Sequence, residues 1–170
     1  KSTVRYNSSN TEIYHEDGTL AVILPASYWR GGTSYVDLKA GDYYFTTPKM
    51  YGSTNSQFRT PIDIGISSKD RDAPQDFENM VELELGKNYS FKKDYYPDCE
   101  YLKINIQEKA NYYISITEGR GFLYNENLEF IDTVGDIYKT MFELDKGTYY
   151  LVIEYTTYAA PNTNVKITQY

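Results

Sequence analysis

The sequence predicts an all-β protein, built as a sandwich or barrel of short strands. Its apolar runs are short, rich in β-branched and aromatic residues, and almost free of helical spacing. Turn-forming Gly, Asn, Asp and Pro separate these runs. The chain has 20 tyrosines against 7 phenylalanines and one tryptophan. Tyrosine suits half-buried strands, because its ring is apolar and its tip is polar.

The expected strands follow from the apolar runs. In chain order they are Leu20–Leu24, Asp42–Thr46, Pro61–Ile66, Met80–Leu85, Tyr101–Ile106, Tyr112–Thr117, Gly121–Tyr124, Thr140–Leu144, Tyr149–Tyr155 and Asn164–Thr168. The expected turns between them are Asp17-Gly18, Lys39-Ala40-Gly41, Gly86-Lys87-Asn88, Glu118-Gly119 and Asp145-Lys146-Gly147.

Composition limits the function classes. The 170 residues are 41% hydrophobic and 24% charged, enough to bury a core. The net charge of -7 argues against nucleic acid and against an anionic membrane surface. The single cysteine, Cys99, excludes an intrachain disulfide. No segment approaches the roughly 20 apolar residues of a membrane span, so we expect no membrane insertion.

An internal repeat organises the chain. Residues 36–44 parallel residues 142–150 as strand, glycine turn and tyrosine pair. We expect a positive φ at Gly41 and Gly147 in these turns. Upstream, residues 13–18 parallel 123–127, so that roughly 13–66 repeat 123–168.

The first copy lacks a counterpart of the stretch from about Asp70 to Phe122. A half sandwich alone would expose its core face, so we expect the first copy to pack against something. The polar segment Gly65–Gln75 is the best linker candidate. The predicted units are residues 1–66, a partial or reduced β unit, and residues 67–170. One continuous sandwich is the alternative.

Four motifs in order over residues 73–170 resemble the bacterial pre-peptidase C-terminal (PPC) family, which is related to the collagen-binding domains of clostridial collagenases. Ala73–Asn79 resembles its opening Glu-Pro-Asn-Asp motif, and Asp98–Ile104 its Asp-x-Asp-Tyr-Phe strand. Leu123–Asn127 resembles its Leu-Tyr-Asp-x-Asp segment, and Leu144–Ile153 its closing Gly-Thr-Tyr-Tyr strand. The resemblance implies a jelly-roll-like antiparallel β-sandwich, with the first copy as a partial second unit.

The resemblance also implies a calcium site in the opening motifs. Asp76 and Asp98 match the family's acidic positions, and Glu100 replaces an aspartate. Calcium takes six to eight oxygen ligands, so clustered carboxylates suit it. Ala73 and Gln75 depart from the family pattern and remove one charge. The alternative is that these carboxylates are solvated or pair with nearby basic side chains.

Ligand binding by the family uses aromatic residues on the closing strands. Here one strand face carries Tyr149 and Tyr155 and is expected to face the core, and the other carries Tyr150. The family's ligand-facing aromatic position falls on Glu154, which weakens a collagen interpretation.

Five aromatic residues are the candidate ligand-binding set: Trp29, Tyr44, Tyr150, Tyr155 and Tyr158. The tyrosines could line a platform for a polysaccharide or a peptide, or could simply cover a sheet. Trp29, in a loop-like stretch with Tyr28 and Arg30, could form a contact site or plug the open end of the first unit.

Catalysis has little support in the sequence. His15 is the only histidine, and neither Gly-x-Ser-x-Gly nor His-Glu-x-x-His occurs. We therefore expect no catalytic residues, no certain cofactor, and a non-catalytic binding or accessory module of a secreted or cell-surface bacterial protein. Its partner would be an extracellular polysaccharide or protein. The alternatives are a structural spacer without a ligand and a small secreted hydrolase with paired carboxylates.

Overall fold

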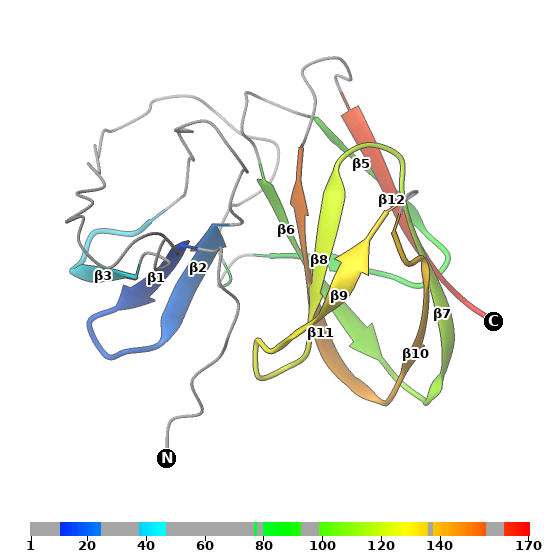
Figure 1. Cartoon of the computed structure of the whole chain (residues 1–170), viewed down its shortest axis with the longest axis horizontal. Helices are drawn as coiled ribbons and strands as arrows, with labels where there is room; N and C mark the ends of the chain where they lie inside the picture. The colour runs from blue at the N-terminus through cyan, green and yellow to red at the C-terminus, as the bar shows by residue number, and fades with distance from the viewer. Residues whose placement is uncertain are drawn as a thin grey trace, which may run out of the picture.

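The chain is all-β in the parts that its structure describes. The computed structural model describes residues 11–24, 38–46, 77, 80–92, 99–135, 138–155 and 162–170. These residues form twelve strands and no helix, and hence no helix that could cross a membrane. The strands make three sheets, and Figure 1 shows the smallest one beside the other two.

The smallest sheet, here called the N-terminal sheet, has the strand order β2-β1-β3. Its strands are β1 (Thr11–His15), β2 (Leu20–Leu24) and β3 (Tyr43–Thr46). Both pairings are antiparallel. The predicted boundary between residues 66 and 67 and the predicted strand Pro61–Ile66 lie outside the described residues.

The two larger sheets form a β-sandwich. The four-stranded sheet has the order β10-β7-β12-β5, and the five-stranded sheet β4-β6-β11-β8-β9. Their strands are β4 (Val81–Leu83), β5 (Asn88–Lys92), β6 (Cys99–Ile106), β7 (Ala110–Ile116), β8 (Arg120–Tyr124), β9 (Phe130–Val134), β10 (Met141–Leu144), β11 (Gly147–Glu154) and β12 (Asn162–Gln169).

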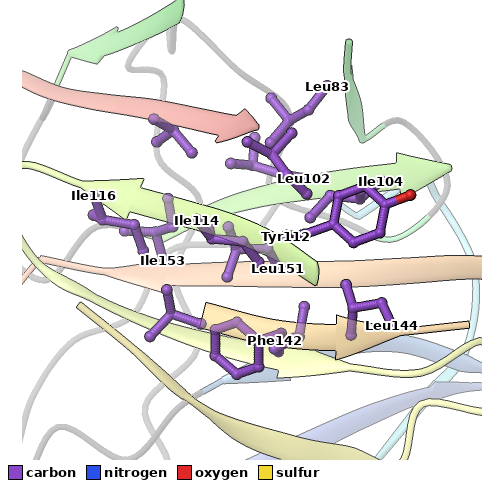
Figure 2. Close-up of a cluster of buried hydrophobic side chains, with 14 of the residues drawn as sticks. Leu83, Leu102, Ile104, Tyr112, Ile114, Ile116, Phe142, Leu144, Leu151 and Ile153 are labelled. Carbon is purple, nitrogen blue, oxygen red and sulfur yellow. The ribbon is translucent and has the colours of Figure 1, made fainter. Parts of the chain in front are cut away.

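The sandwich core follows from the alternation of side chains along its strands. Alternate residues in the middle of β6, β7 and β12 are apolar and buried, so that one face of each sheet is largely apolar. These faces meet in the cluster drawn in Figure 2, where Leu102 and Ile104 of β6 lie with Ile114 of β7 and Leu151 and Ile153 of β11. The inward face predicted for β11 is therefore confirmed.

The predicted antiparallel β-sandwich is confirmed, and among the described strand pairs β4 alone runs parallel to its neighbour, β6. The structure corrects two details of the predicted glycine turns. Strands β10 and β11 belong to different sheets, so the glycine turn between them crosses the sandwich instead of closing a hairpin. Gly41 and Gly147 do not have a positive φ. Instead, each glycine lies next to the ring of the tyrosine two residues later. A Cβ added at Gly41 would lie 3.7 Å from Cε2 of Tyr43, and one added at Gly147 would lie 3.9 Å from Cε2 of Tyr149.

The N-terminal sheet packs on the outer face of the five-stranded sheet, the face away from the sandwich core. Ile13, Val22 and Ile23 of the sheet share a buried cluster with Tyr101 and Val152 of the sandwich. Two hydrogen bonds add to this cluster: the Tyr101 hydroxyl donates to the Ile23 carbonyl at 2.5 Å, and the Phe77 amide donates to the Ala21 carbonyl at 3.2 Å. The first copy thus buries the apolar face that it could not bury alone.

The predicted internal repeat has a counterpart in the strand pairing. The order β2-β1-β3 corresponds to β9-β8-β11. Tyr14 pairs with Tyr44 across β1 and β3 as Tyr124 pairs with Tyr150 across β8 and β11. The register also shifts at equivalent places, after Ile13 in β1 and after Leu123 in β8.

The two turns that follow β1 and β8 are built alike. In the first, the Gly18 amide donates to the His15 carbonyl at 2.9 Å; in the second, the Leu128 amide donates to the Asn125 carbonyl at 2.9 Å. Gly18 has a φ of 83° and Leu128 a φ of 59°, so both occupy the left-handed region. The two copies therefore share pairing, bulge and turn geometry.

The strand that enters each sheet after the glycine turn is fixed by the same contact. The Tyr43 hydroxyl donates to the Lys39 carbonyl at 2.9 Å, and the Tyr149 hydroxyl donates to the Asp145 carbonyl at 3.1 Å. Each bond joins a tyrosine to the residue four positions earlier, as in a tyrosine corner. Burial raises the pKa of Tyr149, although Lys109 and the bond to the Asp145 carbonyl act in the opposite direction.

Candidate ligand-binding surface

The packing of the two units places the predicted ligand-binding tyrosines in different environments. Tyr150 lies on the outer face of the five-stranded sheet, which the N-terminal sheet covers. Its ring packs edge-on against Phe77, with centroids 5.7 Å apart. The ring of Tyr150 is therefore half-buried against the first copy, and ligand binding by Tyr150 stays a prediction.

Two predicted site residues lie inside the sandwich. Tyr155 is 2% exposed, and its hydroxyl donates to a carboxylate oxygen of Glu100 at 3.2 Å. Glu100 is itself 1% exposed. This placement corrects the expectation for Tyr155, since a buried ring cannot line an open platform.

Four predicted site residues lie outside the described residues: Trp29, Tyr158, Asp76 and Asp98. Glu100 is thus the one predicted calcium ligand whose position is described. Within the described ranges, no group of three or more His, Cys, Asp or Glu side chains could hold a metal ion. Calcium binding by Asp76, Asp98 and Glu100 stays a prediction.

Tyr44 lies on the outer face of the N-terminal sheet, the face away from the sandwich. It is 58% exposed. Directly opposite it on β1 is Tyr14, and the neighbouring pair on the same face is Glu12 and Thr46. The Tyr14 hydroxyl donates to a carboxylate oxygen of Glu12 at 2.5 Å. We call these four residues the tyrosine platform.

The repeat explains the polarity of this face, on which Tyr44 and Thr46 are exposed and Glu12 and Tyr14 are half-buried. The equivalent face of the sandwich carries Phe122 and Val152 beside its tyrosine pair, and both pack against the N-terminal sheet. The tyrosine platform has Glu12 and Thr46 at those positions. A carboxylate and a hydroxyl in place of two apolar groups make the face polar enough to meet water, as in the terminal unit of a repeat protein.

An open hollow of about 570 Å³ lies at the ends of β1 and β3. Its lining combines the polar side chains of His15, Asp17, Lys39 and Asp42 with the ring of Tyr43. His15 and Tyr43 are cross-strand partners with ring centroids 5.3 Å apart. This pair directly follows the Tyr14–Tyr44 pair along the two strands, so its side chains lie on the opposite face of the sheet from the tyrosine platform.

Asp17 is already engaged within the hollow. Its carboxylate accepts hydrogen bonds from the Thr19 hydroxyl at 2.6 Å and the Thr19 amide at 2.8 Å. These bonds lower the pKa of Asp17, the side-chain bond most strongly. An ionised, anchored carboxylate can accept hydrogen bonds from a ligand but is a poor proton donor at neutral pH.

Glu154, where the PPC resemblance places a ligand-facing aromatic, is 3% exposed. It pairs with Arg120 across β11 and β8 at 2.7 Å. Burial raises the pKa of Glu154, and the bond and charge of Arg120 only partly offset this. Arg120 also lies over the Phe122 ring, 4.8 Å from its centroid. This position forms part of a closed ion pair and presents nothing to a ligand.

Sequence reasoning missed Tyr14 and Glu12 as platform residues. The signal that finds them is the repeat itself, because Tyr14 aligns with Tyr124 as Tyr44 aligns with Tyr150. Two aligned tyrosine pairs predict a cross-strand pair in each copy. The polar Glu12 then marks the copy whose outer face is not covered.

The chain was compared with family models, curated proteins and solved structures. No family model matches the sequence, and no curated protein matches it. Among solved structures, the chain is similar to the pre-peptidase C-terminal domain of a collagenase from Bacillus anthracis. The TM-score is 0.42 and the identity 15%, over 60% of this chain and 100% of that one. That domain bears the name of the family that the motifs predicted.

Proposed function

We propose that the chain is a non-catalytic binding module of a secreted or cell-surface bacterial protein, and that it holds an extracellular polysaccharide on the tyrosine platform. The observation that carries this proposal is the exposed Tyr44 beside Tyr14 on a sheet face whose equivalent in the sandwich is covered. A module of this kind would keep its parent protein near the polymer and raise the effective concentration there.

The chemistry of the platform suits a hydroxylated polymer. Tyrosine rings offer flat contact area and lose little conformational entropy on binding. Glu12 supplies acceptor oxygens at the edge of that area. A sugar ring could stack on Tyr44 through its C–H face while its hydroxyls donate to the Glu12 carboxylate.

A structural spacer is the second candidate, and one observation favours it. The two units bury an apolar cluster between them, including Ile13, Val22, Tyr124 and Val152, which makes a firm junction. A spacer needs such a junction and no ligand. The two candidates differ in whether substitution of Tyr44 changes any interaction of the chain.

The hydrolase alternative finds less support. A glycoside hydrolase needs one carboxylic acid with a raised pKa to protonate the leaving group. Asp17 in the hollow has a lowered pKa, and the raised pKa of Glu154 belongs to a buried ion pair. We therefore propose no catalytic residue.

A pull-down against insoluble polymers tests the proposal. The panel holds cellulose, chitin, xylan, mucin, peptidoglycan and collagen, each with calcium and with chelator. We expect retention on one polysaccharide, and loss of that retention on Tyr44→Ala. The matched control is Tyr170→Ala, which removes another exposed tyrosine ring outside the platform. Retention on collagen would favour a protein ligand, and no retention on any polymer would favour the spacer.

A further inference from the structure

Strand β3 forms an edge of the N-terminal sheet. Among the strands that the structure describes, β3 pairs with β1 alone. Its repeat counterpart β11 lies between β8 and β6, and pairs with β6 along eight positions from Gly147 to Glu154. Within the described residues, the N-terminal sheet therefore repeats three strands of the sandwich and has no counterpart of β6.

Phe45 is the residue of β3 that a strand equivalent to β6 would cover. It is opposite Ile13, so its side chain is on the inner side of the sheet. Its repeat counterpart Leu151 is 0% exposed and has Leu102 of β6 directly opposite it. Phe45, by contrast, is 38% exposed. The apolar area of Phe45 is thus open on the side where β6 covers Leu151.

The sequence of β3 does not protect this edge. Exposed edge strands in natural proteins commonly carry Lys, Pro or an inward-pointing charge, which prevents pairing with other chains. The four residues of β3 are Tyr-Tyr-Phe-Thr, and none of them is charged or proline. Three of the four are exposed.

We propose that the open edge of β3 binds an extended segment of another protein, which adds an antiparallel strand to the N-terminal sheet. Strand addition of this kind draws affinity from main-chain hydrogen bonds and specificity from alternate side chains. The inference goes beyond polysaccharide binding, because it concerns a protein partner and a different part of the sheet.

The pairing of β6 with β11 defines the segment that fits. Leu102 is opposite Leu151, and Ile104 is opposite Tyr149, with Lys103 between them opposite Tyr150. If a ligand pairs with β3 as β6 pairs with β11, it needs two apolar residues two positions apart, opposite Phe45 and Tyr43. A basic residue between them would lie opposite Tyr44, on the face that carries Glu12.

The probe is therefore a peptide with the sequence Cys99–Ile106, labelled with fluorescein and carrying Cys99→Ser. Titration of the whole chain should give a saturable rise in fluorescence anisotropy. The Phe45→Lys variant should bind at least tenfold more weakly, because it places a charge on the inner side of the edge. Leu85→Lys, which adds the same charge at another exposed apolar residue, should bind as the wild type does.

Hydrogen exchange on the wild type makes the test independent of whether Phe45→Lys folds. Among residues 43–46, the peptide should slow exchange at least tenfold at the amides that point away from β1. A peptide N-methylated at two consecutive residues, Leu102 and Lys103, should not, because one of the two amides always faces the acceptor.

Three outcomes would overturn the proposal. The first is no saturable binding. The second is protection of β11 in place of β3, which would mean that the peptide replaces β6 in the sandwich. The third is a dimer in sedimentation whose β3 amides are already protected without peptide, which would assign the edge to a second copy of the chain.

Discussion

The hydroxyl of Tyr101 donates a buried hydrogen bond to the carbonyl of Ile23, 78 residues earlier in the chain. The bond joins β6 of the sandwich to β2 of the N-terminal sheet, inside the apolar cluster that both share. It makes Tyr101 a direct probe of the contact between the two units.

Tyr101→Phe should lower the free energy of unfolding by about 1–3 kcal/mol, because it leaves the Ile23 carbonyl buried without this donor. Denaturant unfolding measures the change. Tyr113→Phe is the control, since Tyr113 is only half-buried, and should stay within about 0.5 kcal/mol of wild type. Equal effects of the two variants would mean that the bond contributes nothing to the contact.

Tyr44 and Tyr150 occupy equivalent positions in the repeat, but truncation should lower stability at Tyr150 and leave it nearly unchanged at Tyr44. Tyr150→Ala removes a ring that packs against Phe77 and the inter-unit cluster, and should cost about 2–4 kcal/mol of stability. Tyr44→Ala removes an exposed ring and should change stability by less than about 0.5 kcal/mol. Thermal and denaturant unfolding of the two variants check this. A large cost for Tyr44→Ala would mean that Tyr44 is structural, against its role in the platform.

The ion pair of Arg120 and Glu154 should behave as a coupled unit. Replacing either partner by Ala leaves the other charge in a largely buried site and should cost about 3 kcal/mol. The double variant Arg120→Met with Glu154→Leu should lie within about 1 kcal/mol of wild type, because both charges leave together. A double-mutant cycle measures the coupling. Additive losses would contradict the pairing as we describe it.

The raised pKa of Glu154 predicts the sign of a pH dependence. A folded-state pKa above the unfolded value means that the folded chain binds this proton more tightly. The contribution of Glu154 is thus fully present at low pH, and falls as pH rises from about 4.5 through the raised value. The difference in unfolding free energy between wild type and Glu154→Gln should therefore decrease over that range. A rise would indicate that Arg120 outweighs burial.

Gly18 tests the left-handed turn after β1. A Cβ there would touch nothing within 4 Å, so its cost would come from the backbone conformation alone. Gly18→Ala should destabilise the chain by about 1–2 kcal/mol, and Gly18→Asn by less, since Asn tolerates this region. Gly41→Ala is the control, because Gly41 has no positive φ and has room for a methyl group. Similar costs at both positions would contradict the assignment.

Much of the fold could be predicted from the sequence, since buried strands show alternation. Strand β2 coincides with the predicted Leu20–Leu24. Strands β1, β5 and β9 were missed because polar residues interrupt the apolar pattern, as Glu12 and His15 do in β1. A strand at a sheet edge, or one covered on one face only, needs fewer apolar residues, so its signal is weaker.

The site was harder to predict than the fold. The sequence marks Tyr44 and Tyr150 alike, because both are the second tyrosine of a pair after a glycine turn. The packing of one copy on the other separates them, and the difference between Glu12 and Phe122 is the sequence signal that accompanies it. Such packing depends on contacts between residues far apart in the chain, for example Val22 with Tyr101 and Val152, which no local pattern reveals.

The two matching hairpins, β1–β2 and β8–β9, create a problem for the chain while it folds. Both have the same turn hydrogen bonds and the same bulge, so either could dock beside β11. Phe122 of β8 faces the inter-unit cluster there, whereas Glu12 of β1 would bury a carboxylate in it. The difference between Phe122 and Glu12 favours the native arrangement, because the arrangement with β1 beside β11 would bury a carboxylate. The polar residue that opens the platform to solvent thus also directs each hairpin to its own place.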